Sequence, residues 1–170
     1  MAQVLIGLGA NLGDRAANFY AATRELLVRG CQVIALSPIY ETEPWGVTDQ
    51  PRFLNAVCHV RTDLAPTALL DTLKEIERSL GRQETMRDGP RPIDLDILLY
   101  DDLILDTPRL TIPHRGMVDR STVLVPLADL VPNLCHPITG RTVEEHLADL
   151  GPTPDVAPYP PGLPAKRDEK

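Results

Sequence analysis

The sequence has few cysteines, few aromatic residues and no apolar run long enough to cross a membrane. Aromatic residues make up 4% of the chain, and its three cysteines are far apart, without a C-x-x-C spacing. A disulfide framework and a zinc site are therefore not indicated, and we expect Cys31, Cys58 and Cys135 to be small core residues. The first residues lack the basic segment and the apolar length of a signal peptide, so we expect a cytoplasmic protein.

Two further absences limit the partners of the chain. Its formal net charge is −7, so we expect no nucleic-acid partner, and we expect no membrane partner either. No G-K-[ST] motif occurs, and "GLGANLG" at 7–13 does not match G-x-G-x-x-G, so we interpret its glycines as a tight turn between a strand and a helix. A phosphate pocket stays possible, because the placement of individual arginines is independent of net charge.

The length fits one domain, with a change of composition near the end. We expect residues 1–150 to form the folded domain and the protein to be a monomer. From Gly151 onward six of twenty residues are proline and most of the others are polar. Such a segment cannot bury enough apolar area to offset its ordering entropy, so we expect residues 151–170 to be extended or disordered.

Hydrophobic periodicity predicts an alternation of strands and helices. We expect strands over 3–9, 31–42 (interrupted by Pro38), 53–64 and 93–100, helices over 15–30, 66–80, 122–130 and 142–150, a mobile polar loop over 82–89, and a hairpin turn with a return strand over 100–106. The order strand, helix, strand, strand, helix, strand is that of a ferredoxin-like α+β fold, βαββαβ. Its first two helices would cover one face of an antiparallel sheet, leaving the other for ligands and the C-terminal helices.

The segment "GPRPIDLDILLYDD" at 89–102 places two aspartates inside a predicted buried strand. Because side chains alternate along a strand, Asp94 and Asp96 share one face with Leu98 and Tyr100. The other face carries Ile93, Leu95, Ile97 and Leu99. Two carboxylates this close repel each other unless a positive charge separates them. The pattern is compatible with a solvated surface strand and with a site for a divalent cation such as Mg²⁺.

Basic side chains gather on both sides of the aspartate strand. They are Arg82, Arg87, Arg91, Arg109, His114, Arg115 and Arg120. Singly each could be a solvated surface charge, but beside a metal pair they indicate a polyphosphate held by Mg²⁺ and guanidinium groups. A second group, Trp45, Phe53 and Asn55, suits a flat heteroaromatic ligand, with core packing of Phe53 and a turn at Asn55 as the alternative.

These motifs resemble those of the 6-hydroxymethyl-7,8-dihydropterin pyrophosphokinase family. The resemblance lies in "GLGANLGD", "YETEPWG", "DQPRFLNAV", "GPRPIDLDILL" and "RLTIPHRGMVDR" followed by "VLVPLADL", within residues 3–133. It implies a ferredoxin-like fold in three layers, α/β/α, with additional C-terminal helices. It also implies an enzyme of folate biosynthesis that transfers the terminal diphosphate of ATP to the hydroxymethyl group of the reduced pterin and releases AMP.

The resemblance further implies roles for individual residues. Asp94 and Asp96 would hold two Mg²⁺ ions and, with Arg82 and Arg91, form the catalytic group. ATP would contact Glu77, Arg82, Arg87, Arg91, Ile97, Arg109, Thr111, His114, Arg115 and Arg120. The pterin would contact Thr42, Pro44, Trp45, Phe53, Asn55, Asp94 and Thr122. Within that set, Phe53 would stack on the ring, while Asn55 and the backbone at Thr42 and Trp45 would read its edge.

Some positions depart from the family pattern. Thr122 stands where a second aromatic residue is common, which leaves a one-sided stack unless a side chain such as Trp45 compensates. Glu84 and Asp88 stand where the loop often carries an arginine and an aromatic residue, which bears on how it closes over ATP. Two other functions stay open: a ferredoxin-like module that binds nucleotide or RNA, and a different Mg²⁺-dependent transferase that uses D-x-D.

Overall fold

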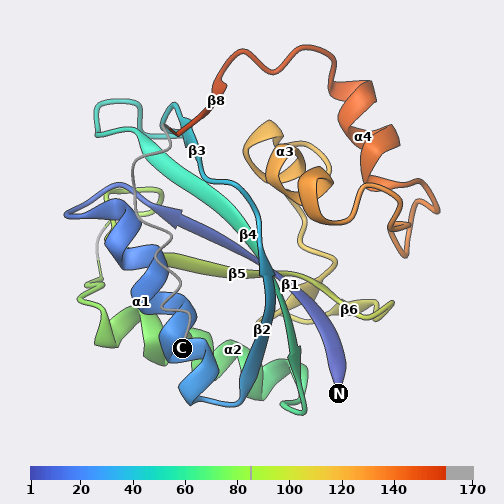
Figure 1. The fold of residues 1–170 in the computed structure, drawn as a ribbon, viewed down its shortest axis with the longest axis horizontal. Helices are drawn as coiled ribbons and strands as arrows, with labels where there is room; N and C mark the ends of the chain where they lie inside the picture. The colour runs from blue at the N-terminus through green and yellow to red at the C-terminus, as the bar shows by residue number, and fades with distance from the viewer. Residues whose placement is uncertain (85, 160–170) are drawn as a thin grey trace, which may run out of the picture.

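The computed structural model describes residues 1–84 and 86–159 (Figure 1). Residue 85 of the predicted mobile loop and tail residues 160–170 lie outside the described residues. The strands are β1 (Ala2–Ala10), β2 (Cys31–Leu36), β3 (Tyr40–Thr42), β4 (Phe53–Thr62), β5 (Asp94–Tyr100), β6 (Leu105–Asp106), β7 (Thr111–Ile112) and β8 (Val156–Pro158). The helices are α1 (Arg15–Val28), α2 (Pro66–Ser79), α3 (Ser121–Leu130) and α4 (Val143–Leu150). The predicted alternation of strands and helices is confirmed.

An antiparallel sheet forms the centre of the molecule, in the order β5-β1-β4-β3-β8, and β2 also pairs with β4. β1 lies between β4 and β5 and is antiparallel to both. The predicted strand over 31–42 is divided into β2 and β3 because Pro38 has no N–H to donate to the ladder. Ser37 bridges the break: its N–H donates to Val57 O at 2.9 Å, and its Oγ accepts from Val57 N–H at 2.9 Å.

Helices α1 and α2 begin and end at local signals in the sequence. Asp14 caps α1, since its carboxylate accepts a hydrogen bond from Ala17 N–H at 3.1 Å. α2 begins at Pro66, which lacks the N–H that the first helical position cannot use. Gly30 and Gly81 follow the two helices with φ of 89° and 96°, which favour glycine. Within the described part of the chain, no helix has the length and hydrophobicity needed to cross a membrane.

Two hydrophobic clusters cover opposite faces of the sheet and give the fold three layers (Figure 1). α1 and α2 pack on one face, where side chains such as Phe19, Leu69 and Ile76 are fully buried. α3 and α4 cover the other face around Leu124 and Val143, in a smaller cluster. Burying each large apolar side chain contributes about 1.5–3 kcal/mol. Because the second cluster is smaller, part of its face stays available for a site.

The alternation predicted for the aspartate strand is wrong at its end. A β-bulge shifts the register of β5 against β1. Leu98 and Leu99 therefore both join the cluster under α3 and α4, while Tyr100 packs against the cluster under α1 and α2. The extra residue of a bulge turns the following side chains to the opposite face. Asp94 and Asp96 precede the bulge and keep the shared face that was predicted.

The predicted hairpin from the aspartate strand into a return strand is also wrong. β6 pairs with β7 in a separate two-stranded ribbon. Asp101, with φ of 46°, is hydrogen-bonded to Gln3 at the start of β1. Its N–H donates to Gln3 O at 2.7 Å, and its carboxylate accepts from Gln3 N–H at 2.8 Å. These bonds direct the chain away from the sheet before β6 begins.

Part of the proline-rich tail belongs to the sheet. β8 pairs with β3, and Tyr159 N–H donates to Ile39 O at 2.9 Å. An edge strand accommodates Pro158 because only one of its sides needs ladder hydrogen bonds. This part of the tail is extended, as one of the two expectations had it. The domain boundary at residue 150 stays a prediction.

The expectation that all three cysteines are core residues is wrong for one of them. Cys31 and Cys58 are buried, and burial raises the pKa of the Cys58 thiol to about 12. Cys135 is exposed, in the segment between α3 and α4, where it forms an isolated bridge with Thr142. Backbone pairing rather than apolar packing therefore places Cys135.

Candidate active site

Two adjoining hollows open on the face of the sheet that α3 and α4 only partly cover. The narrow pocket, of about 100 Å³, lies over β1, β4 and β5. The wide pocket, of about 800 Å³, lies between α2, the segment 82–91 and the segment 114–120. The residues that line both are Asp88, Arg91, Asp94, Asp96, His114 and Arg120. Ligands in the two pockets would therefore meet at the aspartates.

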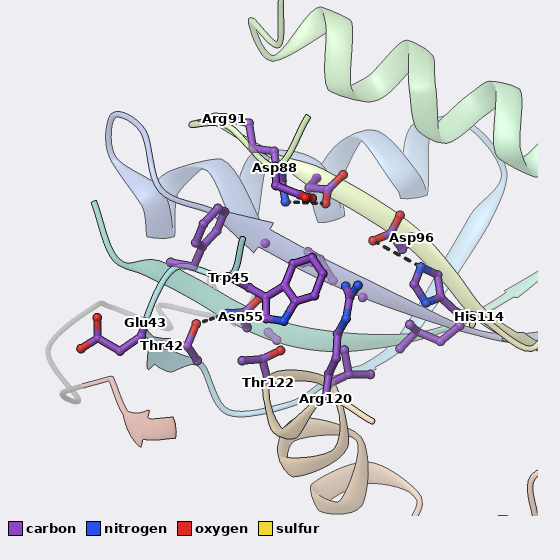
Figure 2. Close-up of a pocket in the computed structure, with 18 residues that line it drawn as sticks. Thr42, Glu43, Trp45, Asn55, Asp88, Arg91, Asp96, His114, Arg120 and Thr122 are labelled. Carbon is purple, nitrogen blue, oxygen red and sulfur yellow. Dashed lines mark hydrogen bonds and ion pairs between the residues drawn. The ribbon is translucent and has the colours of Figure 1, made fainter. Parts of the chain in front are cut away.

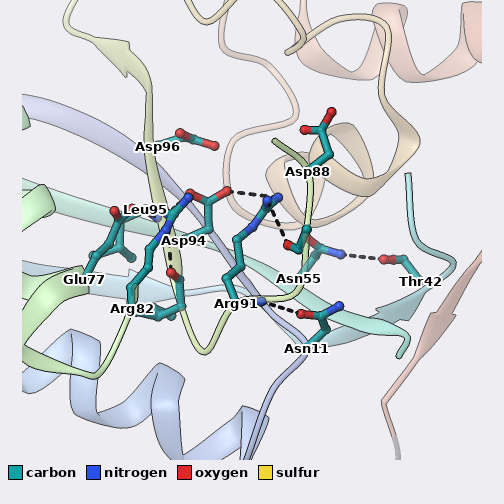
Figure 3. Close-up of polar contacts among 12 residues, drawn as sticks. Asn11, Thr42, Asn55, Glu77, Arg82, Asp88, Arg91, Asp94, Leu95 and Asp96 are labelled. Carbon is teal, nitrogen blue, oxygen red and sulfur yellow. Dashed lines mark hydrogen bonds and ion pairs between the residues drawn. The ribbon is translucent and has the colours of Figure 1, made fainter. Parts of the chain in front are cut away.

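Asp94 and Asp96 lie on β5 in very different electrostatic surroundings. Arg82 Nη1 donates to Asp94 Oδ1 at 2.6 Å, and Arg91 Nη2 lies 3.4 Å from Asp94 Oδ2 (Figure 3). Burial raises the pKa of Asp94, but the charges of Arg91 and Arg82 outweigh it and hold that pKa below its usual value. Burial, and next the charge of Asp94, raise the pKa of Asp96 above its usual value. The nearby charges of His114, Lys74 and Arg91 oppose that rise without cancelling it, and the ion pairs with Arg82 and Arg91 are made by Asp94.

Glu77 supports this arrangement from beneath the strand. Its carboxylate is buried and accepts a hydrogen bond from Leu95 N–H at 2.8 Å. It also lies 3.0 Å from Arg82 Nη1 and 3.4 Å from Lys74 Nζ. Burial raises the pKa of Glu77, and its hydrogen bond from Leu95 and the nearby cations oppose that rise. Glu77 therefore fixes β5 and Arg82 in the wall of the wide pocket.

The donor set at the aspartates fits Mg²⁺. Across residues 1–84 and 86–159, no group of three or more His, Cys, Asp or Glu side chains forms a metal cage. Mg²⁺ does not need one, because it keeps several waters and is commonly held by one or two carboxylates plus phosphate oxygens. The raised pKa of Asp96 marks an excess of negative charge that a divalent cation would relieve. Asp94 and Asp96 could therefore hold Mg²⁺ together with a phosphate ligand.

His114 presents a hydrogen-bond donor to the region between the pockets (Figure 2). Gly116 N–H donates to His114 Nδ1 at 3.1 Å. Since Nδ1 accepts this bond, the ring proton sits on Nε2, which lies 4.0 Å from Asp96 Oδ2. A phosphate oxygen beside Asp96 would find that N–H already oriented.

Two glycines of β1 form part of the floor of the narrow pocket. Gly7 and Gly9 pair with Asp96 and Asp94 across the β1–β5 ladder. A Cβ at Gly9 would lie 3.3 Å from Asn55 Oδ1, so glycine leaves the room that this amide needs. The strand predicted over 3–9 contains Gly7 and Gly9, and the prediction that the "GLGANLG" glycines form a turn is wrong for these two. The sequence did not show that they lie opposite the two aspartates.

The walls of the narrow pocket combine rings with an amide. Asn55 Nδ2 donates to Thr42 Oγ1 at 2.6 Å (Figure 3). Phe53 is 7% exposed, whereas Trp45 is 60% exposed. Thr122 also lines this pocket. A flat ring with donors and acceptors on one edge matches such a lining.

A hydrogen-bonded chain ties together the loops around the pockets. Asn11 Oδ1 accepts from Arg91 N–H at 2.8 Å (Figure 3). Asn11 Nδ2 donates to Gln50 Oε1 at 2.9 Å. Gln50 Nε2 in turn donates to Asp88 O at 2.8 Å. The loops that follow β1, β3 and α2 are thus held to one another through side-chain amides. Asn11 and Gln50 were not predicted, since nothing in their local sequence shows this contact.

Most of the predicted site residues line at least one of the two pockets. Those of the narrow pocket alone are Thr42, Trp45, Phe53, Asn55 and Thr122. Those of the wide pocket alone are Glu77, Arg82, Arg87 and Arg115, and those of both pockets are Arg91, Asp94, Asp96, His114 and Arg120. The pockets thus bring together, from four separate segments of the chain, residues that the sequence could only group by type.

Four predicted residues lie outside both pockets: Pro44, Ile97, Arg109 and Thr111. Ile97 is 3% exposed in the core, and Arg109 pairs with Asp71 on the surface. Lys74 lines the wide pocket but was not predicted. Its position three residues before Glu77 on α2 was the available signal, because such residues share a helix face.

Comparison with known proteins now identifies the family. A family model described as 7,8-dihydro-6-hydroxymethylpterin-pyrophosphokinase matches residues 5–132. The chain belongs to this family. A curated relative from Methylorubrum extorquens, named 2-amino-4-hydroxy-6-hydroxymethyldihydropteridine pyrophosphokinase, is 45% identical over 90% of this chain and 96% of its own length. One of the same name from Pseudomonas aeruginosa is 45% identical over 86% of this chain and 90% of its own.

Other relatives of the pyrophosphokinase family are much longer proteins. The folic acid synthesis protein fol1 of Schizosaccharomyces pombe is 43% identical over 85% of this chain, which spans 20% of that relative. The crystal structure of Plasmodium falciparum HPPK-DHPS with pteroate matches with a TM-score of 0.71 and 17% identity, over 87% of this chain and 42% of that one. This last likeness shows a shared mixed α/β fold.

Proposed function

We propose that the wide pocket binds ATP and the narrow pocket binds 6-hydroxymethyl-7,8-dihydropterin. Family membership makes the chain a pyrophosphokinase of folate biosynthesis, which moves the terminal diphosphate of ATP to the hydroxymethyl oxygen of the pterin and leaves AMP. The observation that carries the assignment of the pockets is that they meet at Asp94 and Asp96. Direct transfer needs the acceptor hydroxyl and the β phosphorus in line and in contact, which two separate cavities would not allow.

Two Mg²⁺ ions are proposed to bind between the triphosphate and the carboxylates of Asp94 and Asp96. Bound there, Mg²⁺ would neutralise the triphosphate and stabilise charge on the transferring group. Asp94 is already ionised in its arginine pair, and the raised pKa of Asp96 gives that carboxyl the most to gain from a cation. The fit of Mg²⁺ to the site therefore rests on the carboxylates of Asp94 and Asp96.

The other side chains bind and orient the substrates. Arg82, Arg91 and Arg120 line the wide pocket and would hold phosphate oxygens through their guanidinium groups. His114 would add the Nε2–H that Gly116 orients. On the pterin side, the Asn55 amide would read the ring edge and Phe53 would stack on its face. The acceptor hydroxyl then attacks phosphorus directly, without a covalent intermediate on the enzyme.

The finer description of the fold is also a proposal. The central strands β5-β1-β4-β2 are antiparallel neighbours, and α1 and α2 each connect two strands that another strand separates. This split βαβ arrangement supports a ferredoxin-like core. The cytoplasmic location and the monomeric state stay predictions. A native mass measurement on the purified protein would check the oligomeric state.

Phosphorus NMR of the protein with Mg²⁺, ATP and the hydroxymethyl pterin tests the reaction. We expect AMP and a pterin diphosphate in equal amounts, and neither product from the Asp96→Asn variant. ADP would indicate an ordinary kinase, such as a different Mg²⁺-dependent transferase acting on another acceptor. Bound ATP without turnover would indicate a nucleotide-binding module.

A further inference from the structure

Two aromatic side chains of the narrow pocket, Phe53 and Trp45, each contact an arginine that also lines the wide pocket. Arg91 Cζ lies 5.1 Å from the centre of the Phe53 ring. Arg120 Cζ lies 4.5 Å from the centre of the Trp45 ring. Both guanidinium groups are therefore within reach of a triphosphate while they contact the walls of the pterin pocket. These pairs link the two cavities through side chains.

The two pairs differ in how firmly the ring is fixed. Phe53 is 7% exposed at the start of β4, where the sheet holds it. Trp45 is 60% exposed in the segment between β3 and β4. Figure 2 shows its indole beside the Arg120 guanidinium, and Thr122 lines the same pocket. Thr122 has no ring, so Trp45 is the second aromatic surface that this pocket offers.

We propose that the Trp45 indole stacks on the pterin ring and that Arg120 positions it. The inference rests on the proposed function, because it requires the narrow pocket to take the pterin. The guanidinium lies over the indole, which is 60% exposed and lines the narrow pocket, so a flat heteroaromatic ring in that pocket can stack on the exposed indole surface. Trp45 then supplies the stacking surface that an aromatic residue at position 122 would supply.

Two glycines permit this placement. A Cβ at Gly116 would lie 2.7 Å from Arg120 Nε, so glycine leaves the path along which Arg120 reaches Trp45. Gly46, directly after Trp45, has φ of 78°, and a Cβ there would lie 3.1 Å from Asp88 Oδ2. The turn that carries the indole is thus packed against the segment that precedes the aspartates. Another residue at position 116 would displace the Arg120 side chain, and one at position 46 would be strained by the positive φ.

The same geometry connects the two substrates. Phosphate oxygens in the wide pocket attract the guanidinium that stacks on Trp45, so ATP changes the surroundings of the indole. Trp45 is the chain's one tryptophan, so fluorescence excited beyond the absorption band of the four tyrosines reports on this side chain alone. We expect a non-hydrolysable ATP analogue with Mg²⁺ to shift the emission of the wild type. Arg120→Lys, which keeps the charge but not the planar group, should show a smaller shift.

A double-mutant cycle at positions 45 and 122 tests the stacking role. Pterin affinity is measured by calorimetry with Mg²⁺ and the ATP analogue in wild type, Trp45→Leu, Thr122→Phe and the double variant. Trp45→Leu should weaken binding about tenfold, which is the usual effect of losing one stacked ring. Trp45→Phe is the matched control and should lose much less. Because Trp45 is largely exposed, the melting temperature of these variants should stay near that of the wild type.

The double-mutant cycle separates loss of a stacking ring from a general loss of pterin affinity. Thr122→Phe should restore most of the affinity lost in Trp45→Leu, and its effect in that background should exceed its effect in the wild type, since the two rings replace each other. Equal effects of Thr122→Phe in both backgrounds, or a Trp45→Leu variant that binds pterin as the wild type does, would overturn the proposal. If the wild type makes AMP while the cycle gives either result, this inference alone fails; if the wild type does not bind pterin, the proposed function fails with it.

Discussion

The narrow and wide pockets share six lining residues but are built from different parts of the fold. The narrow pocket rests on strands: its floor is β1 and β5, and Phe53 and Asn55 come from β4. The wide pocket is lined mostly by charged side chains from α2 and from the segments 82–91 and 114–120. A rigid, small cavity suits a ligand read by shape. An open cavity lined by charged side chains suits a flexible triphosphate, because charge rather than an exact fit of shape holds such a ligand.

This difference implies that the two substrates are recognised by different parts of the fold. Substitutions on the strands should act on the pterin alone, and substitutions on α2 should act on ATP alone. Substitutions at the shared aspartates should act on transfer itself.

Asp96→Asn should reduce turnover about a hundred- to a thousandfold, because a neutral amide cannot balance the metal charge at the transferring group. The fold should not suffer. The pKa of Asp96 is raised in the folded state, so its carboxyl favours folding only while protonated, and that contribution is lost as pH rises through the raised pKa. At pH 7 the variant should thus unfold at the same or a higher temperature. Wild-type turnover, or a marked fall in melting temperature, would contradict this account.

Asn55→Leu should raise the KM for the pterin about ten- to a hundredfold, because the ring edge loses its amide partner in a partly buried pocket. The KM for ATP should stay within about twofold, since Asn55 lines the narrow pocket alone. Steady-state kinetics with each substrate varied in turn provides the measurement. Thr42→Val is the matched control, which removes the Oγ1 that Asn55 contacts without removing the amide. Equal increases in both KM values would break the division between the pockets.

Lys74→Ala should raise the KM for ATP by about fivefold and leave the KM for pterin unchanged, because one charge-assisted contact from α2 is lost. Arg24→Ala on α1 is the control, an exposed cation that lines neither pocket. An effect of the same size in both variants would show that net charge, rather than the position of Lys74, governs ATP binding.

Acidification should weaken Mg²⁺ binding in the presence of an ATP analogue. Asp96 must lose its proton to bind a cation, and its raised pKa brings that loss closer to neutral pH. Calorimetric titration with Mg²⁺ at several pH values should show affinity falling as pH falls, with a shallower dependence in Asp96→Asn. The same pH dependence in both proteins would assign it to the phosphates of the nucleotide.

The sequence predicted some features of each pocket and missed others, for a physical reason. Alternation along a strand is enough to place Asp94 and Asp96 on one face, but charge type alone does not place an arginine, since Arg109 pairs with Asp71 outside both pockets. The role of Gly7 and Gly9 depends on their register opposite those aspartates, which only the folded sheet sets. Asn11 and Gln50 likewise meet through loops that are distant in sequence.

Local patterns failed where neighbouring elements decide the outcome. The β-bulge in β5 places Leu99 on the face opposite to the one that simple alternation predicts. The prolines of the tail were enough to predict an extended or disordered segment, but not that Val156–Pro158 would pair with the edge of β3. Helix ends, by contrast, were predictable because Asp14, Pro66 and the following glycines act within one turn of the chain.

The central claim is that both substrates meet at the aspartates of β5. A crystal structure of the protein with Mg²⁺, a non-hydrolysable ATP analogue and the hydroxymethyl pterin tests it most directly. The account predicts the pterin hydroxyl facing the β phosphorus, with cations on the carboxylates of Asp94 and Asp96. A pterin bound outside the narrow pocket, or carboxylates that contact no cation, would contradict it.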